Sequence, residues 1–326
     1  MTRESEIHAI VGAGPVGTAL AGLLAARGHP VRLLTRSGRE PRIAGVQPVA
    51  VDASDAAALT AAMQGAAVLY NCANPGPYPV WERDWPPLAS AMLLAAERAG
   101  AVLVTASNLY GYGPVDGPMS RSTPLRPSDH KGALRARMWR EALAAHEAGR
   151  VRVAEARSSD YLGPTLPLAG GMIARYAERT LLGRPATVFA DPDQPHSWTA
   201  IDDVAATLAA LGREERAWGG AWIVPSNPPA TVRELLRGLG DAVGAPEPRL
   251  RTAPRWQLRV GGLAIPMLRE LGGVLYQFDR PFVADGAETS AAFGVVASPW
   301  EPLLAQTART WESRARAGRS APAVRP

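Results

Sequence analysis

Lys131 is the only lysine among the 35 lysine and arginine residues of this 326-residue chain. An ammonium group is a compact donor whose pKa shifts when it is desolvated, whereas a guanidinium stays charged and planar. The position therefore predicts a small cation that holds a ligand hydroxyl or lowers the pKa of a neighbouring acid. Arginine-biased coding that left one lysine by chance is the alternative. His130 precedes it and titrates near neutral pH, but adjacent helical residues point about 100° apart, so only one of the two can face a common ligand.

A glycine motif near the start of the chain predicts a dinucleotide site. Gly12, Gly14 and Gly17 follow an apolar strand at residues 7–11 and open an alanine- and leucine-rich helix. In this context the first glycine permits the tight turn, the second lets a pyrophosphate approach the backbone, and the third lets helix and strand pack closely. The helix N-terminus then offers amide donors to the phosphates.

The end of the second expected strand favours NADP over NAD. A carboxylate there would hold the ribose 2′-hydroxyl of NAD, but the chain has Thr35, Arg36 and Ser37. Arg36 can pair with a 2′-phosphate, and the two hydroxyls can donate to it. Asp52 ends the third strand and is expected to receive the adenine amino group or to cap the following helix.

Composition narrows the class of protein. The single cysteine, Cys72, leaves no intramolecular disulfide framework and, with no secretory leader pattern, predicts a cytosolic protein. No apolar run reaches the ~18 residues of a membrane span, and no Cys/His cluster has metal-ligand spacing. Residues 309–326 hold five arginines and one glutamate, which is +4 of the formal +5. The basic charge is thus expected in a solvated tail, and no nucleic-acid partner is predicted.

Strands that alternate with helices must position these residues. Apolar strands are expected at 7–11, 31–35, 46–51, 66–70, 101–105 and 151–156, and helices at 18–27, 55–64, 87–99 and 128–148. This alternation predicts an α/β fold with a doubly wound parallel Rossmann sheet. We expect residues 1–163 to form the NADP-binding domain, with later segments completing the sheet, 164–310 to form a smaller C-terminal substrate domain, and 311–326 to be a disordered basic tail. In the substrate domain, helices are expected at 168–182 and, as one piece, at 258–275.

The chain resembles the extended and atypical short-chain dehydrogenase/reductases, which include NAD(P)-dependent sugar-nucleotide epimerases and dehydratases. The likeness covers roughly residues 7–240 and is carried by segments in the expected order: GAGPVG at 12–17, VDASD at 51–55, YNCANP at 70–75, VTASNLYGYGP at 104–114, RSSDYLGP at 157–164 and WTAIDDVAATLAAL at 198–211. The resemblance implies that further residues line the cofactor, namely Pro15, Val16, Ala53, Cys72, Ala73, Asn74 and Ser158.

The catalytic motif of that family is incomplete in this chain. The motif is Tyr-x-x-x-Lys, in which the lysine holds the nicotinamide ribose and the tyrosine exchanges the substrate proton. Lys131 is similar in place to the lysine, but Pro127 stands four residues before it. If Lys131 is instead placed at the tyrosine position, Arg135 falls at the lysine position. The serine of the family is displaced too, because Ser107 lies one residue past the expected place.

Other groups must then exchange the proton. Tyr110, just past the fifth strand, is the expected general acid if a cation such as Lys131 depresses its pKa, with Ser107 and His130 as further catalytic candidates. Tyr78, Asp160 and His196 are expected to contact the substrate, or else to pack or cap their own loops.

The sequence thus predicts an NADP-dependent oxidoreductase or epimerase acting on a small organic carbonyl or hydroxyl compound. Two alternatives stay open: a non-catalytic NADP-binding sensor, and a non-redox cyclase or dehydratase on the same fold. The choice between a monomer and a homodimer is open as well.

Overall fold

The computed structural model describes residues 6–39 and 42–320 of the chain. Within them, a seven-stranded parallel sheet has the order β10-β6-β5-β4-β1-β2-β3. Its strands are β1 Ile7–Val11, β2 Val31–Thr35, β3 Val46–Ala50, β4 Ala66–Asn71, β5 Val102–Asn108, β6 Arg152–Ser158 and β10 Gly220–Ile223. The order reverses between β1 and β4, and ligands of open α/β sheets bind beside such a point. The predicted doubly wound Rossmann fold is confirmed.

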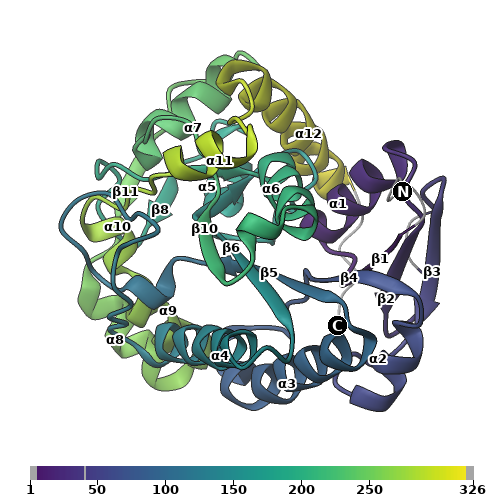
Figure 1. The fold of residues 1–326 in the computed structure, drawn as a ribbon. Coiled ribbons are helices and arrows are strands. Elements are labelled where there is room, and N and C mark those ends of the chain that lie inside the picture. Colours follow the sequence, from purple (N-terminus) through teal and green to yellow (C-terminus); the bar gives the residue numbers. More distant parts are fainter. Residues whose placement is uncertain (1–5, 40–41, 321–326) are drawn as a thin grey trace.

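Helices cover both faces of the sheet (Figure 1). One face carries α1 (Pro15–Ala26) and α6 (Ile201–Arg213), which pack on each other. The other carries α2 (Ala56–Ala62), α3 (Trp81–Ala99) and α4 (His130–Glu147). Strands β1 and β4 lie between these layers and are largely buried on both sides, which explains their nearly continuous apolar sequences, whereas the edge strand β3 is partly exposed.

Two helices differ locally from their prediction. Helix α3 begins at Trp81, six residues before the expected start at 87, and contains Pro86 and Pro87 in its second turn. Proline removes a hydrogen bond from a helix interior, so the sequence favoured a start at the second proline. The extra turn is instead held by burial of the Trp81 and Trp85 side chains. Helix α2 is capped by Asp55, whose carboxylate accepts from the amides of the first turn, so Asp52 is not the cap.

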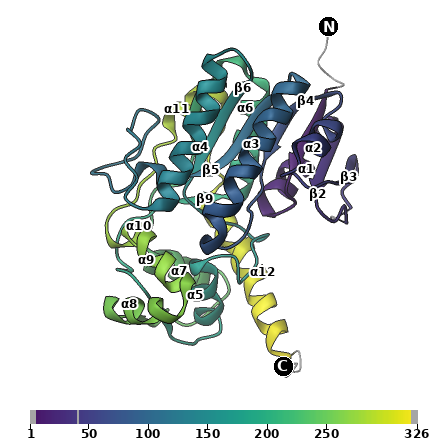
Figure 2. The same cartoon turned by 90° about the horizontal axis from the view of Figure 1, so that it is seen from below.

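The segments at 160–200 and 232–279 gather at one end of the sheet (Figure 2), whereas residues 287–293 pack beside the sheet against β10 and α6. Two short parallel pairs link the segments at that end, β7 with β9 and β8 with β11. The elements are β7 Asp160–Leu162, β8 Ala186–Val188, β9 Trp198–Ala200, β11 Leu250–Thr252, α5 Met172–Thr180, α7 Val232–Asp241, α8 Arg255–Ala264, α9 Pro266–Val274, α10 Tyr276–Asp279, α11 Ala287–Phe293 and α12 Trp300–Ser320. A later segment joins the sheet, because β10 pairs with β6.

Two C-terminal predictions need correction. The single helix expected at 258–275 is two helices, α8 and α9, because Ile265 is extended and Pro266 starts α9. The tail expected from residue 311 is helical as far as Ser320, as the end of α12. The Trp311 side chain is fully buried there, and its indole donates to the carbonyl of Leu166. Residues 321–326 lie outside the described part of the chain.

Candidate functional site

A cavity of about 1650 Å³ opens along the carboxyl ends of the strands. It runs from the ends of β2 and β3, past the turn between β1 and α1, to α5, α9 and α10. Most of the predicted cofactor residues line it: Gly12, Gly14, Pro15, Val16, Thr35, Arg36, Ser37, Asp52, Ala53, Cys72, Ala73, Asn74 and Ser158. Of the predicted catalytic and substrate residues, Ser107, Tyr110, Tyr78 and Asp160 line it as well.

The turn between β1 and α1 has the geometry that a dinucleotide needs. Gly12 has φ +98°, and a Cβ there would stand 2.7 Å from the carbonyl oxygen of Cys72. A Cβ on Gly17 would overlap the carbonyl of Gly12, so this glycine serves helix packing behind the lining. A Cβ on Gly14 would meet nothing within 4 Å, which leaves the space in front of the α1 amides free for a pyrophosphate. The residues present therefore fit the cofactor.

An arginine and an aspartate line the end of the cavity beside β2 and β3. Arg36 is exposed and follows β2, and Asp52 follows β3. Asp52 accepts from the amide (2.9 Å) and the hydroxyl (2.7 Å) of Ser54. These two bonds, with a smaller contribution from Arg36, lower the pKa of Asp52. Asp52 is thus an ionised acceptor at neutral pH, as recognition of an amino group requires.

Arg135 is a site residue that sequence reasoning passed over. Its guanidinium lines the middle of the cavity, donates to the Ser107 hydroxyl (2.9 Å) and the Ala106 carbonyl (3.0 Å), and lies 4.6 Å above the Trp85 ring. Burial lowers its pKa, yet within the described part of the chain no carboxylate is within ion-pair distance. The i, i+4 spacing from Lys131 was the available signal. Arg135 is a buried cation held at the cavity by neutral acceptors.

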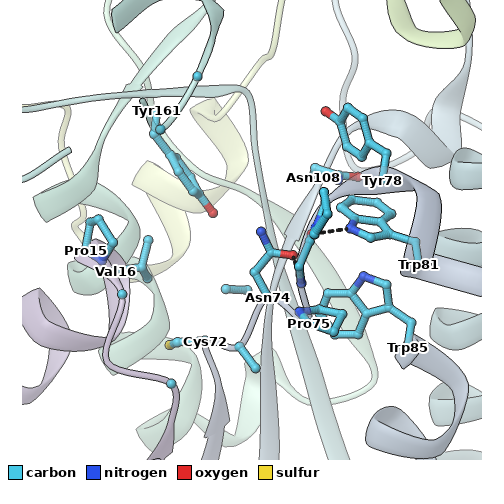
Figure 3. A pocket seen from close by; sticks show the side chains of 18 of the residues that line it. Pro15, Val16, Cys72, Asn74, Pro75, Tyr78, Trp81, Trp85, Asn108 and Tyr161 are labelled. Atoms are coloured by element: carbon cyan, nitrogen blue, oxygen red, sulfur yellow. Dashed lines mark hydrogen bonds between the residues drawn. The ribbon is translucent and has the colours of Figure 1, made fainter. Parts of the chain in front are cut away.

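Tyr161, on β7, is a second residue that was not anticipated. Figure 3 shows its hydroxyl directed into the pocket between Val16 and Asn74. Burial raises the pKa of Tyr161, and a hydrogen bond with Ser158 partly opposes that shift. The phenol is therefore protonated at neutral pH. The Ser158 hydroxyl itself donates to the carbonyl of Ser107 at 3.1 Å, so β5, β6 and β7 meet at this point.

Tyr78 and Tyr110 form a phenol pair in the cavity wall. Their hydroxyl oxygens lie 2.7 Å apart. Burial raises the pKa of Tyr78 to about 12, whereas a hydrogen bond from Tyr110 acts to lower it. Burial, Tyr78 and Asp160 raise the pKa of Tyr110 well above its usual value, and Gln277 lowers it in part. The expected depression of the Tyr110 pKa is therefore wrong, because burial and the neighbouring Tyr78 and Asp160 all raise it. Both phenols are neutral donors near pH 7.

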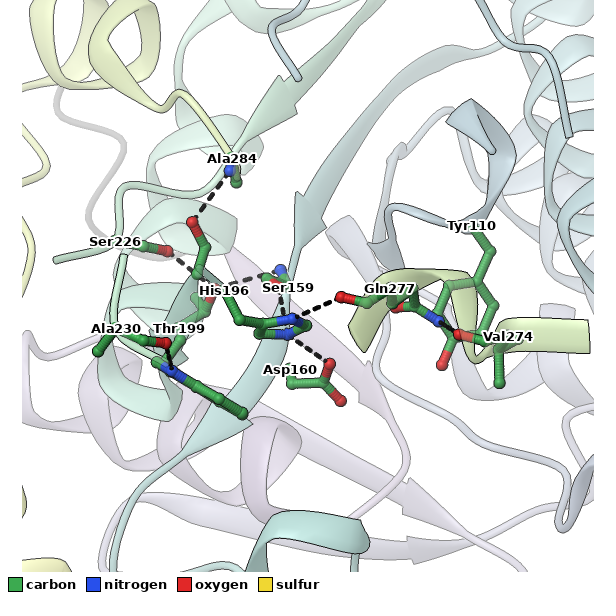
Figure 4. A network of polar contacts seen from close by, with 12 residues as sticks. Tyr110, Ser159, Asp160, His196, Thr199, Ser226, Ala230, Val274, Gln277 and Ala284 are labelled. Carbon is green, nitrogen blue, oxygen red and sulfur yellow. Dashed lines mark hydrogen bonds and ion pairs between the residues drawn. The ribbon is translucent and has the colours of Figure 1, made fainter. Parts of the chain in front are cut away.

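Asp160 and His196 form a dyad at the substrate end, as Figure 4 shows. The Asp160 side chain is 39% exposed and lines the cavity, whereas His196 is 1% exposed behind it and is not part of the lining. The imidazole Nε2 lies 2.9 Å from the Asp160 carboxylate, and Nδ1 lies 3.1 Å from the Gln277 carbonyl. The ring stacks on Phe278 and Phe282. Of the two residues predicted to contact the substrate here, Asp160 thus lines the cavity and His196 does not.

The structure places Lys131 and His130 elsewhere than we expected. The Lys131 ammonium is 1% exposed and contacts the Asp129 carboxylate (2.7 Å), the Glu270 carboxylate (3.0 Å) and the Glu270 carbonyl (3.0 Å). His130 Nε2 also lies 3.0 Å from Glu270. Neither residue lines the cavity. The ammonium donates two hydrogen bonds to Glu270 and forms an ion pair with Asp129, so Lys131 joins α4 to α9 instead of facing a nicotinamide ribose.

Across residues 6–39 and 42–320, no group of three or more His, Cys, Asp or Glu side chains is arranged to hold a metal ion. In the same part of the chain, no helix has both the length and the apolar sequence to cross a membrane.

Comparison with solved structures finds the same fold in sugar-nucleotide enzymes. UDP-glucose 4-epimerase from Thermus thermophilus, in complex with NAD, is 21% identical with a TM-score of 0.75 over 94% of this chain and 98% of that one. UDP-glucose 4-epimerase from Thermotoga maritima with UDP-glucose is 15% identical, with a TM-score of 0.77 over 94% and 99%. dTDP-glucose 4,6-dehydratase from Bacillus anthracis with NAD is 15% identical, with a TM-score of 0.77 over 95% and 98%.

At these identities the likeness to solved structures establishes the fold. No curated protein matches the chain. A sequence-family model, that of the NAD dependent epimerase/dehydratase family, matches residues 9–222. That match spans the dinucleotide turn, the phenol pair, the Asp160–His196 dyad and the strands that carry them, and by it the chain belongs to the NAD-dependent epimerase/dehydratase family.

Proposed function

We propose that the protein is an NADP-dependent oxidoreductase or epimerase of the short-chain type that acts on a small organic carbonyl or hydroxyl compound. The observation that carries this proposal is one continuous cavity. It joins Arg36, at the adenosine end, through the glycine turn to the phenol pair and Asp160. Because the chain has a single cysteine, we propose that the protein is cytosolic. A monomer and a homodimer both stay open.

The preference for NADP is the finer part of the proposal. Two of the compared structures are complexes with NAD. In this chain β2 ends without a carboxylate, and Thr35, Arg36 and Ser37 line the cavity at that place. Arg36 would pair with a 2′-phosphate, and the adjacent hydroxyls would donate to it.

Arg135 is proposed to bind the nicotinamide ribose in place of the expected Lys131. One guanidinium nitrogen, Nη2, already donates to the Ala106 carbonyl and the Ser107 hydroxyl. The other guanidinium donors are available to ribose hydroxyls, because arginine presents five N–H groups. Since burial makes a lone cation costly, a ligand acceptor at this place would lower the energy of the site.

The nicotinamide supplies hydride acceptance and donation when it is bound. The phenol pair supplies the proton. Tyr78 and Tyr110 are protonated near pH 7, so one of them can donate its hydroxyl proton to a carbonyl oxygen that becomes an alcohol, while the other stabilises the phenolate through their shared hydrogen bond. Solvent then restores the proton.

The dyad offers a second proton-transfer group. We propose that the Asp160 carboxylate accepts a proton from a substrate hydroxyl. His196, whose Nε2 lies 2.9 Å from Asp160 and whose Nδ1 lies 3.1 Å from the Gln277 carbonyl, holds that carboxylate in position. A reaction that both removes and returns protons, as epimerisation does, needs two such groups.

The cofactor proposal predicts selective loss of NADPH affinity in Arg36→Ala. A charged hydrogen bond of about 1.5–3 kcal/mol corresponds to roughly ten- to hundred-fold weaker NADPH binding, with NADH binding unchanged. NADPH and NADH are titrated against wild type, Arg36→Ala and the control Arg39→Ala, which changes an exposed arginine outside the cavity lining. Equal affinities for the two cofactors in wild type would contradict the NADP assignment.

Turnover separates the enzyme from its alternatives. Wild type with NADPH is expected to oxidise it when a carbonyl substrate is added, and Tyr78→Phe/Tyr110→Phe is expected to bind NADPH normally and to lose turnover. Tight NADPH binding without turnover across a broad carbonyl panel favours the sensor. Conversion of a substrate with no change in NADPH absorbance, and with no transient oxidation in a single turnover, favours the cyclase or dehydratase.

A further inference from the structure

The substrate end of the cavity has very little charge. From Leu166 onwards, its lining residues carry a single charged side chain, that of Arg175, which is exposed on α5. The other lining side chains of α9 and α10 are apolar except Gln277, and the amide of Gln277 already donates to the Val274 carbonyl. That exposed arginine is the only cationic side chain among the lining residues of this half to oppose two phosphate charges.

The shape of α9 explains how this wall is made. Met267, Leu268, Leu271 and Val274 follow helical spacing and line the cavity. Glu270 lies at the edge of this face, one turn from Met267 and from Val274, where it binds Lys131. The ion pair thus fixes the rotation of α9 and keeps its apolar face toward the cavity.

The polar groups at this end are also unsuited to an anion. Asp160 brings a carboxylate to the lining, and a phosphate beside it would be repelled at short range. The neutral phenols of Tyr78 and Tyr110 and the carboxylate of Asp160 match a carbonyl or a hydroxyl group, each of which needs one donor or one acceptor.

We propose that the substrate is an apolar ketone or secondary alcohol without a phosphate group, and not a nucleoside diphosphate sugar. Its oxygen lies among Tyr78, Tyr110 and Asp160, and its hydrocarbon part lies on the apolar face of α9 and on Phe278 and Phe282. Ile265, which lines the cavity and is also exposed, extends the apolar surface to the rim. This inference rests on the proposed function and specifies the substrate class.

The test is a chain-length series of ligands on the full-length protein saturated with NADP⁺. Binding of 2-butanone, 2-hexanone, 2-octanone and 2-decanone is measured by titration calorimetry, with UDP and UDP-glucose as the charged comparison. Burial of one CH₂ contributes about 0.8 kcal/mol, so affinity is expected to rise about fourfold for each added CH₂. UDP and UDP-glucose are expected not to bind at millimolar concentration.

Two matched variants test whether the apolar face of α9 contacts the ligand. Leu271→Asp puts a charge on the lining face of α9 and is expected to weaken 2-decanone binding at least tenfold. Leu263→Asp makes the same change at an exposed leucine of α8 outside the lining and is expected to leave binding unchanged. NADPH affinity and thermal midpoint confirm that both variants fold, and Leu271→Ser replaces Leu271→Asp if the charged variant does not.

Several outcomes overturn the inference. They are affinity that does not change with chain length, failure of the whole ketone series to bind, and binding of UDP-glucose that Arg175→Ala abolishes. Failure of the proposed function looks different: the ketones bind with the expected length dependence, yet NADPH is not oxidised. Conversely, turnover of UDP-glucose would retain the enzyme and overturn the apolar substrate.

Discussion

Two cations one helical turn apart on α4 have different partners. Lys131 is neutralised by Asp129 and Glu270, and so it ties the start of α4 to α9. Arg135 has neutral partners and faces the cavity. A buried cation with paired carboxylates stabilises packing, whereas one that lacks them is available to a ligand. Lys131, the rare residue type in the sequence, is therefore structural, whereas Arg135 is proposed to bind the cofactor.

Substitution of these two cations should separate stability from binding. Lys131→Met leaves two buried carboxylates without their cation, and removal of one partner of a buried pair costs roughly 3–5 kcal/mol. Arg135→Met removes a charge that has no carboxylate partner, so we expect a weaker effect on unfolding and a loss of cofactor affinity of at least tenfold. Urea unfolding and NADPH titration of both variants measure the two effects. Unchanged unfolding in Lys131→Met would contradict its structural role, and unchanged NADPH affinity in Arg135→Met would contradict ribose binding.

At the scale of elements, local signals predicted the first half of the fold well. Strand β1 and the glycine turn came directly from an apolar run and three glycines, and β2 from the VRLLT run at 31–35. The short strands β7, β8, β9 and β11 were not predicted, because three residues carry no periodicity and pair only through contacts distant in sequence. The break at Pro266 has a local cause in the proline, but the apolar run at 258–275 favoured one helix. The helix through residue 320 was missed because burial of Trp311, which the sequence does not display, holds it.

The site was predictable to the same extent. Residues on the turn after β1 or at a strand end were placed correctly at the cavity, because topology brings the carboxyl ends of parallel strands together. The dyad was not foreseen as a pair, because Asp160 and His196 meet only when β7 pairs with β9. The direction in which Lys131 points depends on α9, which lies 139 residues later in the chain and is positioned by tertiary contacts.

Glycine at position 132 is required by the contact between α4 and the turn that carries Tyr110. A Cβ there would overlap the carbonyl oxygen of Tyr110 and stand 3.0 Å from the Pro127 side chain. We expect Gly132→Ala to lower the free energy of unfolding and to weaken turnover by displacing the phenol pair. The control is Gly22→Ala in α1, where a Cβ meets nothing within 4 Å, and alanine should stabilise by up to about 1 kcal/mol. Thermal midpoints of the two variants should therefore shift in opposite directions, and a shared upward shift would contradict the packing argument.

At the scale of the whole molecule, the cavity divides into a charged cofactor half and an apolar substrate half. The glycine turn and β1–β5 form the first, and the segments after Leu166 form the second. The sheet core beneath the cofactor half carries a buried polar pair, His8 of β1 and Tyr70 of β4, whose Nδ1 and hydroxyl lie 3.1 Å apart. Stability of the cofactor half is thus linked to proton uptake in its core.

This linkage predicts acid sensitivity. Burial, with smaller contributions from His29 and Arg213, lowers the pKa of His8 from 6.5 to about 4. Between these two values the folded protein binds fewer protons than the unfolded chain. The contribution of His8 to the free energy of unfolding is therefore fully present above pH 6.5 and is lost as pH decreases toward 4, by about 3 kcal/mol in all. Urea unfolding at intervals from about pH 7 to pH 4 is compared between wild type and His8→Gln, and the variant should show the smaller slope. Equal slopes would assign the acid sensitivity to other groups.

The pairing of Lys131 with Glu270 has one more consequence. Lys131 carries the sole side-chain amine in the chain, and that amine is 1% exposed beneath α9. An acylating reagent can reach Nζ only after α9 has separated from α4, so the rate at which the Lys131 peptide gains mass measures how often the roof of the substrate pocket lifts. Acylation of Lys131, followed by mass spectrometry, thus reports access to the pocket without any substitution in the chain.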